Sequence, residues 1–156
     1  MTPTLRALFA LAVLSACAGA AQAQTVVTME GRCEKLVIAG QDITQNCKEK
    51  LTNTVVGTRT SFDFAAHDGQ TLSFAGSGAQ QEATEVTEQL QPINLVTPGR
   101  SSKEGIVRSP APGVGSCKFS SPEPGKTQIA CEANSQGKSY VGIFITDAKP
   151  KDAPKP

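Results

Sequence analysis

Aromatic residues and histidine are scarce in this chain of 156 residues, which has no tryptophan, one tyrosine, six phenylalanines and one histidine. Its core must therefore rest on valine, isoleucine, leucine and those few phenylalanines, a small apolar supply for this length. A single histidine also leaves no second one for a common histidine-based metal site. In an oxidising compartment, a core this thin is where disulfides are expected.

An excess of charge of one sign is also missing. The 15 lysines and arginines and 14 acidic residues give a formal net charge of +1, and loss of Arg6 with an N-terminal leader would leave 14 of each. Nucleic-acid binding needs many lysine and arginine contacts to phosphates. The composition therefore excludes a nucleic-acid partner, and its evenness along the chain indicates one domain.

The N-terminal apolar run, residues 7–14, is too short for a transmembrane helix. Arg6 precedes it, and the small-residue site Ala21-Gln22-Ala23 follows it. This pattern predicts a signal peptide over residues 1–23 and a mature chain that begins at Gln24.

A second processing site competes with the first. Leu14-Ser15-Ala16-Cys17 resembles the bacterial lipobox, in which the cysteine is lipidated and becomes the first residue. Cleavage after Ala23 predicts a periplasmic or secreted protein, whereas lipidation of Cys17 predicts an outer-membrane lipoprotein. Both predict export from a bacterial cytoplasm, and membrane attachment follows only from the second.

Four cysteines remain in the mature chain, and their spacing predicts two local disulfides. Cys33 and Cys47 are fourteen residues apart, as are Cys117 and Cys131. An even separation lets both members of a pair face each other from one side of a hairpin. Each bridge would close a loop of about 15 residues, worth about 3 kcal/mol. Zinc is the alternative for four cysteines, but C-x2-C spacing is missing, and so is the spacing of a redox-active pair.

The segment from Cys117 onward predicts three antiparallel strands. Cys117 is expected to face Cys131 across one hairpin, and a three-residue loop at residues 135–137 would then set Val141 opposite Cys131. One apolar face would thus run across all three strands and carry the disulfide.

A three-residue loop is also predicted at residues 67–69, because it sets Phe64 opposite Leu72 and Phe62 opposite Phe74. A two-residue loop would place polar residues opposite these rings, since a shift of one residue turns every side chain to the other face. The glycine at the third loop position suits the left-handed conformation that this turn needs.

Four further turns are predicted from glycine, proline and asparagine, at residues 39–41, 52–53, 97–100 and 124–125. The segment 76–91 is rich in glycine, glutamine and glutamate. It is compatible with a short helix, a polar edge strand or a mobile loop.

Together these signals predict an all-β fold: a small antiparallel meander barrel, or a sandwich, of about eight or nine short strands stapled by two intra-hairpin disulfides. The domain is expected to span residues 24–147. Residues 148–156, rich in proline and lysine, predict a disordered tail.

No catalytic constellation is evident, so we expect no enzyme, no cofactor and no metal site. His67 and Asp68 are expected at an exposed hairpin tip, where they would not converge on a substrate. The S-x-x-K pattern at residues 135–138 needs a helix, which Gly137 in a turn prevents. The segment 124–127 ends like a phosphate-binding loop but lacks the first glycine of that motif.

One charge asymmetry remains. Three glutamates, Glu82, Glu85 and Glu88, are followed by Arg100, Lys103 and Arg108. The basic residues are candidates for steering a charged partner, and solvated or mutually paired faces are the alternative.

These observations favour a monomeric, exported envelope protein that binds another envelope or secreted protein through its loops, without enzymatic activity. The predicted architecture resembles, in outline only, bacterial envelope inhibitors of lysozymes and proteases. The alternative is a structural envelope lipoprotein anchored through Cys17.

Overall fold

The computed structural model describes residues 23–85 and 88–147. The predicted signal-peptide residues up to 22, the lipidation candidate Cys17 and the tail 148–156 lie outside these described residues. Besides one short 3-10 helix, η1 (Thr44–Asn46), the described part is built of strands. They are β1 (Gln24–Ile38), β2 (Gln41–Asp42), β3 (Cys47–Val56), β4 (Arg59–Ala66), β5 (Gln70–Ser77), β6 (Gln89–Ser102), β7 (Gly105–Arg108), β8 (Ala111–Ser120), β9 (Thr127–Ser135) and β10 (Lys138–Thr146).

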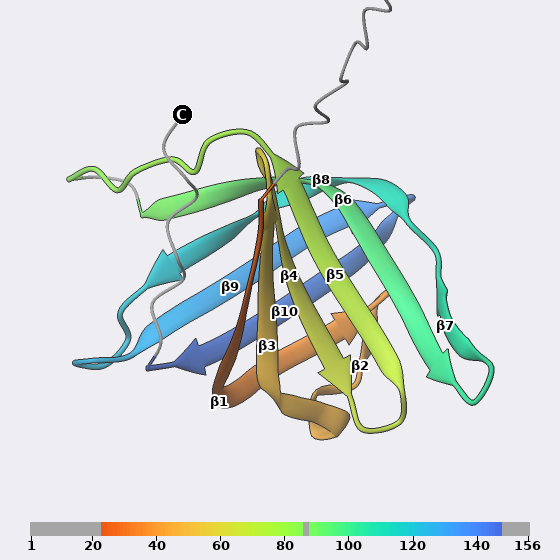
Figure 1. Ribbon diagram of the computed structural model, residues 1–156. Coiled ribbons are helices and arrows are strands. Elements are labelled where there is room, and N and C mark those ends of the chain that lie inside the picture. The colour runs from red at the N-terminus through yellow and green to blue at the C-terminus, as the bar shows by residue number, and fades with distance from the viewer. Residues whose placement is uncertain (1–22, 86–87, 148–156) are drawn as a thin grey trace, which may run out of the picture.

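Eight of these strands form a closed antiparallel barrel (Figure 1). They follow the order β10-β9-β8-β6-β5-β4-β3-β1, and pairing of β1 with β10 joins the two ends of this series. The short strands β2 and β7 pair with β1 and β6. The predicted meander barrel is thus confirmed, and the sandwich is not adopted. Within the described residues, no helix has the length and hydropathy that crossing a bilayer requires.

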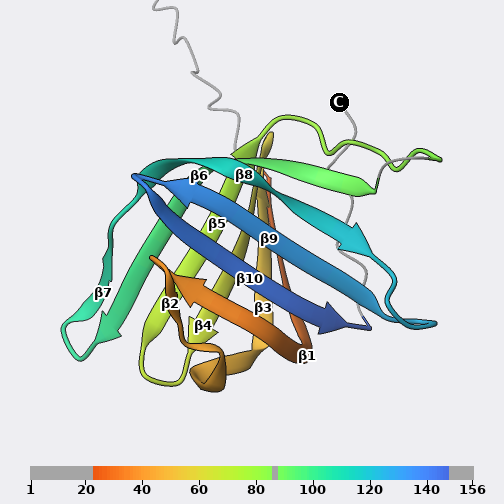
Figure 2. The same ribbon diagram turned by 180° about the vertical axis from the view of Figure 1, so that it is seen from behind.

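Two long strands, β1 and β6, change neighbours along their length (Figure 2). β1 pairs with β3 up to Glu30 and with β10 from Gly31 onward. At this change of partner a Cβ on Gly31 would collide with the backbone carbonyl of Ile145, so close approach of two backbones requires a glycine. β6 pairs with β8 in its first half and with β5 and β7 in its second.

A β-bulge adjusts the inner face of β1. The register against β10 shifts between Cys33 and Lys35, which leaves Glu34 as an extra residue. Strict alternation would turn Cys33 inward and Leu36 outward. With the extra residue both face the interior, and Leu36 is fully buried.

Three of the predicted local features are confirmed. Cys117 lies directly opposite Cys131. The loop at residues 67–69 has three residues and sets Phe64 opposite Leu72, with a φ of 86° at its glycine. In the turn at residues 123–126, the backbone N–H of Lys126 donates to the carbonyl of Glu123, and the glycine has a φ of 77° as a type II turn requires.

The predicted three-residue loop at residues 135–137 is wrong by one residue. Ser135 pairs with Lys138, which leaves the two-residue turn Gln136-Gly137 with φ angles of 50° and 73°. These angles belong to a type I′ turn, whose twist matches that of the flanking strands.

This register places Gly142, and not Val141, opposite Cys131. Both faces of β10 carry apolar residues, so hydrophobic alternation alone does not select one of them. In the structure the face with the aromatic rings of Tyr140 and Phe144 turns to the interior, and both rings are buried.

Three other predicted turns are wrong as well. Residues 52–53 lie within β3, and the turn into β4 is Gly57-Thr58. Residues 97–100 lie within β6, because pairing with β5 and β7 continues through them. The first turn has two residues, Ala39-Gly40, and not three. In the segment 76–91 the described residues contain no helix: β5 extends to Ser77 and β6 begins at Gln89.

Candidate binding surface

The barrel interior is the first place to look for a ligand site, and side chains occupy it. The rings of Phe62 on β4 and Phe119 on β8 have centroids 5.7 Å apart, although these strands are not neighbours. Phe64 on β4 reaches the opposite wall at Gly142 on β10, where a Cβ would lie 2.6 Å from the Phe64 ring. Contacts across the barrel therefore take the space that a bound small molecule would need.

Three of the buried polar side chains, Asn53, Ser135 and Thr146, donate hydrogen bonds to the backbone of neighbouring strands. The Asn53 amide donates to the carbonyl of Ser61 at 3.0 Å, and the Ser135 hydroxyl donates to that of Pro112 at 2.7 Å. The Thr146 hydroxyl donates to the carbonyl of Glu30 at 2.7 Å. These groups are hydrogen-bonded within the wall, as buried polar atoms must be, and so they contribute to the fold rather than to a binding site.

The two disulfides confirm the predicted pairs. The Cys117–Cys131 bridge joins directly opposed residues of β8 and β9 inside the barrel, with a Cα–Cα distance of 3.9 Å, and both cysteines are fully buried. The Cys33–Cys47 bridge continues the β1–β3 register three residues beyond the last pair of that ladder, with Cα atoms 6.1 Å apart. Structural disulfides indicate an oxidising environment outside the cytoplasm.

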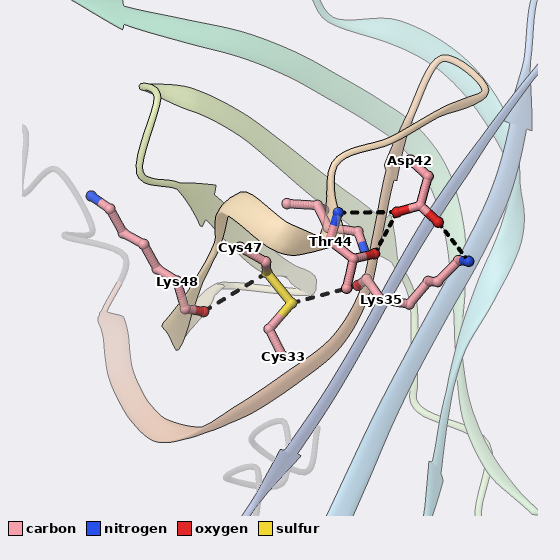
Figure 3. Close-up of a disulfide and its surroundings, with 7 residues drawn as sticks. Cys33, Lys35, Asp42, Thr44, Cys47 and Lys48 are labelled. Carbon is pink, nitrogen blue, oxygen red and sulfur yellow. Dashed lines mark hydrogen bonds and ion pairs between the residues drawn. A yellow bond between two sulfur atoms is a disulfide. The ribbon is translucent and has the colours of Figure 1, made fainter.

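A polar network lies beside the Cys33–Cys47 bridge (Figure 3). Asp42 accepts a 2.8 Å bond from the Lys35 ammonium, and bonds of 2.6 and 3.0 Å from the hydroxyl and backbone N–H of Thr44. These donors, Lys35 first, hold the pKa of the Asp42 carboxyl well below its usual value. The Thr44 hydroxyl in turn accepts from the backbone N–H of Leu36, so the network fixes the loop between β1 and β3.

His67 and Asp68 lie at an exposed hairpin tip, as predicted. The Asp68 carboxylate accepts from the backbone N–H and the side-chain amide of Gln70 at 3.1 and 2.9 Å, and from the Asn46 amide at 3.4 Å. Gln70 first, and then the charge of Arg100, lower the pKa of Asp68. The carboxylate is therefore engaged in the turn rather than paired with His67. Among the described residues, no three histidine, cysteine, aspartate or glutamate side chains lie together as a metal site would require.

The three predicted steering residues share one element, which we call the β6–β7 hairpin (residues 97–108). In its paired part Gly99 lies opposite Arg108 at one end and Ser102 lies opposite Gly105 at the other. Lys103 lies in the turn between the two strands. In this hairpin β6 lies beside the barrel strand β5, and Figure 1 shows β7 on the outer side of β6, at the margin of the sheet. All three basic residues are exposed there: Arg100, Lys103 and Arg108.

Two large apolar side chains on the same hairpin are exposed to solvent. Ile106 is 53% exposed and Val107 is 68% exposed. Because successive side chains of a strand alternate, they point to opposite faces of β7. Opposed residues share a face, so Val107 lies on the face of Arg100, and Ile106 lies on the face of Arg108.

The charges of this hairpin are only partly offset. Arg100 interacts with Asp68 on the neighbouring tip, whereas Lys103 and Arg108 form no ion pair with any residue that the structure describes. The hairpin pairs with the start of β5, whereas the acidic segment that contains Glu82 and Glu88 follows the end of β5. An eight-residue strand separates its two ends by about 23 Å. Mutual neutralisation of the acidic and basic groups is therefore not observed.

Sequence reasoning placed the basic residues on the surface but missed the exposed apolar pair. A signal for it exists: in the four-residue strand Gly-Ile-Val-Arg two apolar residues are adjacent, so a strand on the rim must expose at least one of them. Because a turn was predicted at residues 97–100, where the chain is in fact extended, the hairpin formed by β6 and β7 was not recognised from the sequence.

We compared the chain with protein-family models, with curated proteins and with solved structures, and none of the three comparisons returned a match. The function is therefore argued from the geometry of the barrel and its surface.

Proposed function

We propose that this chain is an exported, non-enzymatic binding module that recognises a protein partner through the β6–β7 hairpin. One observation carries the proposal: the barrel interior is packed, while a hairpin at its rim presents Ile106 and Val107 between exposed cations. Scaffolds of this kind are rigid, and recognition is usually carried by the loops at their ends.

A protein partner fits this surface better than a small molecule does. Small-molecule sites are concave and enclose most of the ligand. This hairpin instead exposes Ile106 and Val107 to solvent on its two opposite faces. Protein interfaces combine apolar anchors with arginine and a polar rim. The hairpin offers such a combination, with Val107 beside Arg100 and Ile106 beside Arg108.

The proposed location is the periplasm or the exterior of a bacterial cell. Two features support it: the signal-peptide pattern that ends at Ala23, and two disulfides that need an oxidising compartment. Gln24, the residue after the predicted cleavage site, is the first residue of β1.

The proposal is tested by site-specific photocrosslinking of the exported protein in its own envelope. A photoreactive residue at Val107 is expected to capture a discrete protein partner. Val114 on β8, which is 81% exposed, provides a matched control position that is expected not to capture it. Equal capture at both positions, or none at Val107, would contradict a site on the hairpin.

Charge-reversal variants extend this test. In K103E/R108E, crosslinking at position 107 is expected to fall strongly, because a steering field acts on the association rate and depends on local charge. The variant K118E/K138E changes net charge by the same amount at exposed positions elsewhere and is expected to leave capture unchanged.

A second candidate role, a structural envelope lipoprotein, is favoured by the complete match of Leu14 to Cys17 to a lipobox. Mass spectrometry of the purified N-terminus separates the two. A chain that begins at Gln24 excludes the lipid anchor, and a diacylated Cys17 establishes it.

A further inference from the structure

We infer that β7 is an acceptor edge for strand addition, along which an extended acidic segment of the partner pairs with residues 105–108. The inference rests on the proposed function and specifies how the partner is held. It requires an open edge, outward-facing backbone groups, side-chain contacts for the added strand and a charge preference.

The edge is open because β7 pairs on one side only. It pairs with β6, and among the described residues no other strand pairs with it. β9 covers β8 only from Val114 to Ser120, so its coverage ends before β7 is reached. In Figures 1 and 2, β7 accordingly forms the margin of the sheet.

The backbone groups on that edge can be assigned. The N–H of Ser109 donates to the carbonyl of Pro98 at 2.9 Å, and the Gly105 carbonyl accepts from the Ser102 hydroxyl at 3.1 Å. In an antiparallel ladder, alternate residues direct their N–H and C=O groups to the same neighbour. The groups of Gly105 and Val107 therefore point to β6, and those of Ile106 and Arg108 point away from the sheet. Two N–H and two C=O groups are thus presented to an incoming strand.

The length of the edge limits what it can bind. The turn at residues 103–104 ends it on one side, and Pro110, which has no backbone N–H, ends it on the other. A short edge bounded by charged residues and proline resists edge-to-edge aggregation with further chains. Such protection is expected of a strand edge that stays exposed to solvent. This edge holds a segment of about four or five residues.

Side chains on both faces add to the backbone contacts. An added strand would place alternate side chains against Val107 and Arg100 on one face, and against Ile106 and Arg108 on the other. Strand-addition sites derive affinity from main-chain hydrogen bonds and specificity from such alternate side-chain contacts.

The charges select an acidic occupant. Lys103 and Arg108 lie at the two ends of β7, and no described residue neutralises them by an ion pair. Pairing of two copies through this edge would bring two sets of Arg100, Lys103 and Arg108 into one interface, which like-charge repulsion opposes. An extended segment with carboxylates at alternate positions meets both requirements.

A membrane surface fits the hairpin less well. Insertion into a bilayer needs one apolar tip, but the tip of this hairpin is Lys103-Glu104. Ile106 and Val107 lie behind it and point to opposite faces. A carboxylate at the tip also opposes approach to an anionic lipid surface.

The test uses a displayed library of random twelve-residue peptides, selected against the mature disulfide-bonded protein. Selected peptides are expected to alternate acidic and apolar residues, and their affinity is expected to fall as the salt concentration rises. Binding is then measured to I106P and I106T. The first removes an outward N–H at a position where an edge strand tolerates proline, and the second changes the side chain but keeps the N–H.

I106P is expected to bind the selected peptides about tenfold more weakly than I106T, since it lacks a main-chain hydrogen bond and blocks the edge. Circular dichroism and an unchanged melting temperature establish that I106P folds. If I106P does not fold, hydrogen exchange of the wild-type protein decides: bound peptide should protect the Ile106 and Arg108 amides.

The strand-addition inference would be overturned by failure to select acidic peptides, by equal binding of the peptides to I106P and I106T, or by protection of amides elsewhere than β7. Binding of the hairpin to anionic phospholipid vesicles, or dimerisation abolished by K103E/R108E, would also overturn it. Loss of partner capture at Val107 would instead remove the proposed function itself, so the two failures are distinguishable.

Discussion

Gly142 provides a direct test of the packed barrel. A Cβ at this position would lie 2.6 Å from two carbon atoms of the Phe64 ring, and Phe64 is 1% exposed, so the ring has little room to move. Overpacking a core in this way costs about 1–3 kcal/mol. Replacing glycine by alanine also restricts the unfolded chain, which returns only about 0.4–1 kcal/mol. The collision therefore dominates, and G142A is expected to lose about 1–2 kcal/mol.

For a domain of this size the loss corresponds to a melting temperature lower by about 4–8 °C, measurable by calorimetry or by urea denaturation. S139A, on an exposed position of the same strand, is the matched control and is expected to be nearly neutral. In an F64L background the collision is relieved, so G142A should become neutral or stabilising there. If G142A alone, with Phe64 retained, keeps full stability, the packed-interior explanation is refuted, because the interior would then have free space beside Phe64.

Three further predictions concern the turn, the disulfides and the acid response. Q136N is expected to raise the free energy of unfolding by about 0.5–1 kcal/mol, because asparagine tolerates the φ of 50° better than glutamine; a lower urea midpoint would contradict this. A brief pulse of reductant should open the half-buried β1–β3 disulfide before the fully buried β8–β9 disulfide. Alkylation of the released thiols followed by peptide mapping measures this order, and equal reduction rates of the two disulfides would show that burial does not control access. Because its pKa is lowered from 3.8 on folding, Asp42 contributes stability that is complete above that pH and is lost as pH falls toward the folded value. The difference in unfolding free energy between wild type and D42N should therefore shrink as pH falls below 4, and a constant difference would argue against the Asp42 network.

Local chemistry was enough to predict several features of this protein. The even spacing of the cysteines predicted both disulfides, since members of a cross-strand pair must lie on one face. The loop at residues 67–69 was predictable because only one register sets Phe62 and Phe64 opposite apolar residues. The all-β barrel followed from alternating short segments and turns, and the basic residues of the hairpin were visible as candidates.

Tertiary structure decided the features in which local signals were balanced. Both faces of β10 are apolar, so the register at Gln136-Gly137 depends on which rings fill the barrel, and Tyr140 and Phe144 lie inside it. Residues 97–100 look like a turn, yet they remain extended because β5 and β7 pair with them from both sides. That continuation of β6 creates the protruding hairpin, and with it the open edge of β7. The candidate surface thus depends on the tertiary arrangement, in which β6 pairs on both sides near residues 99–100 while β7 pairs with β6 alone and keeps its outer edge open.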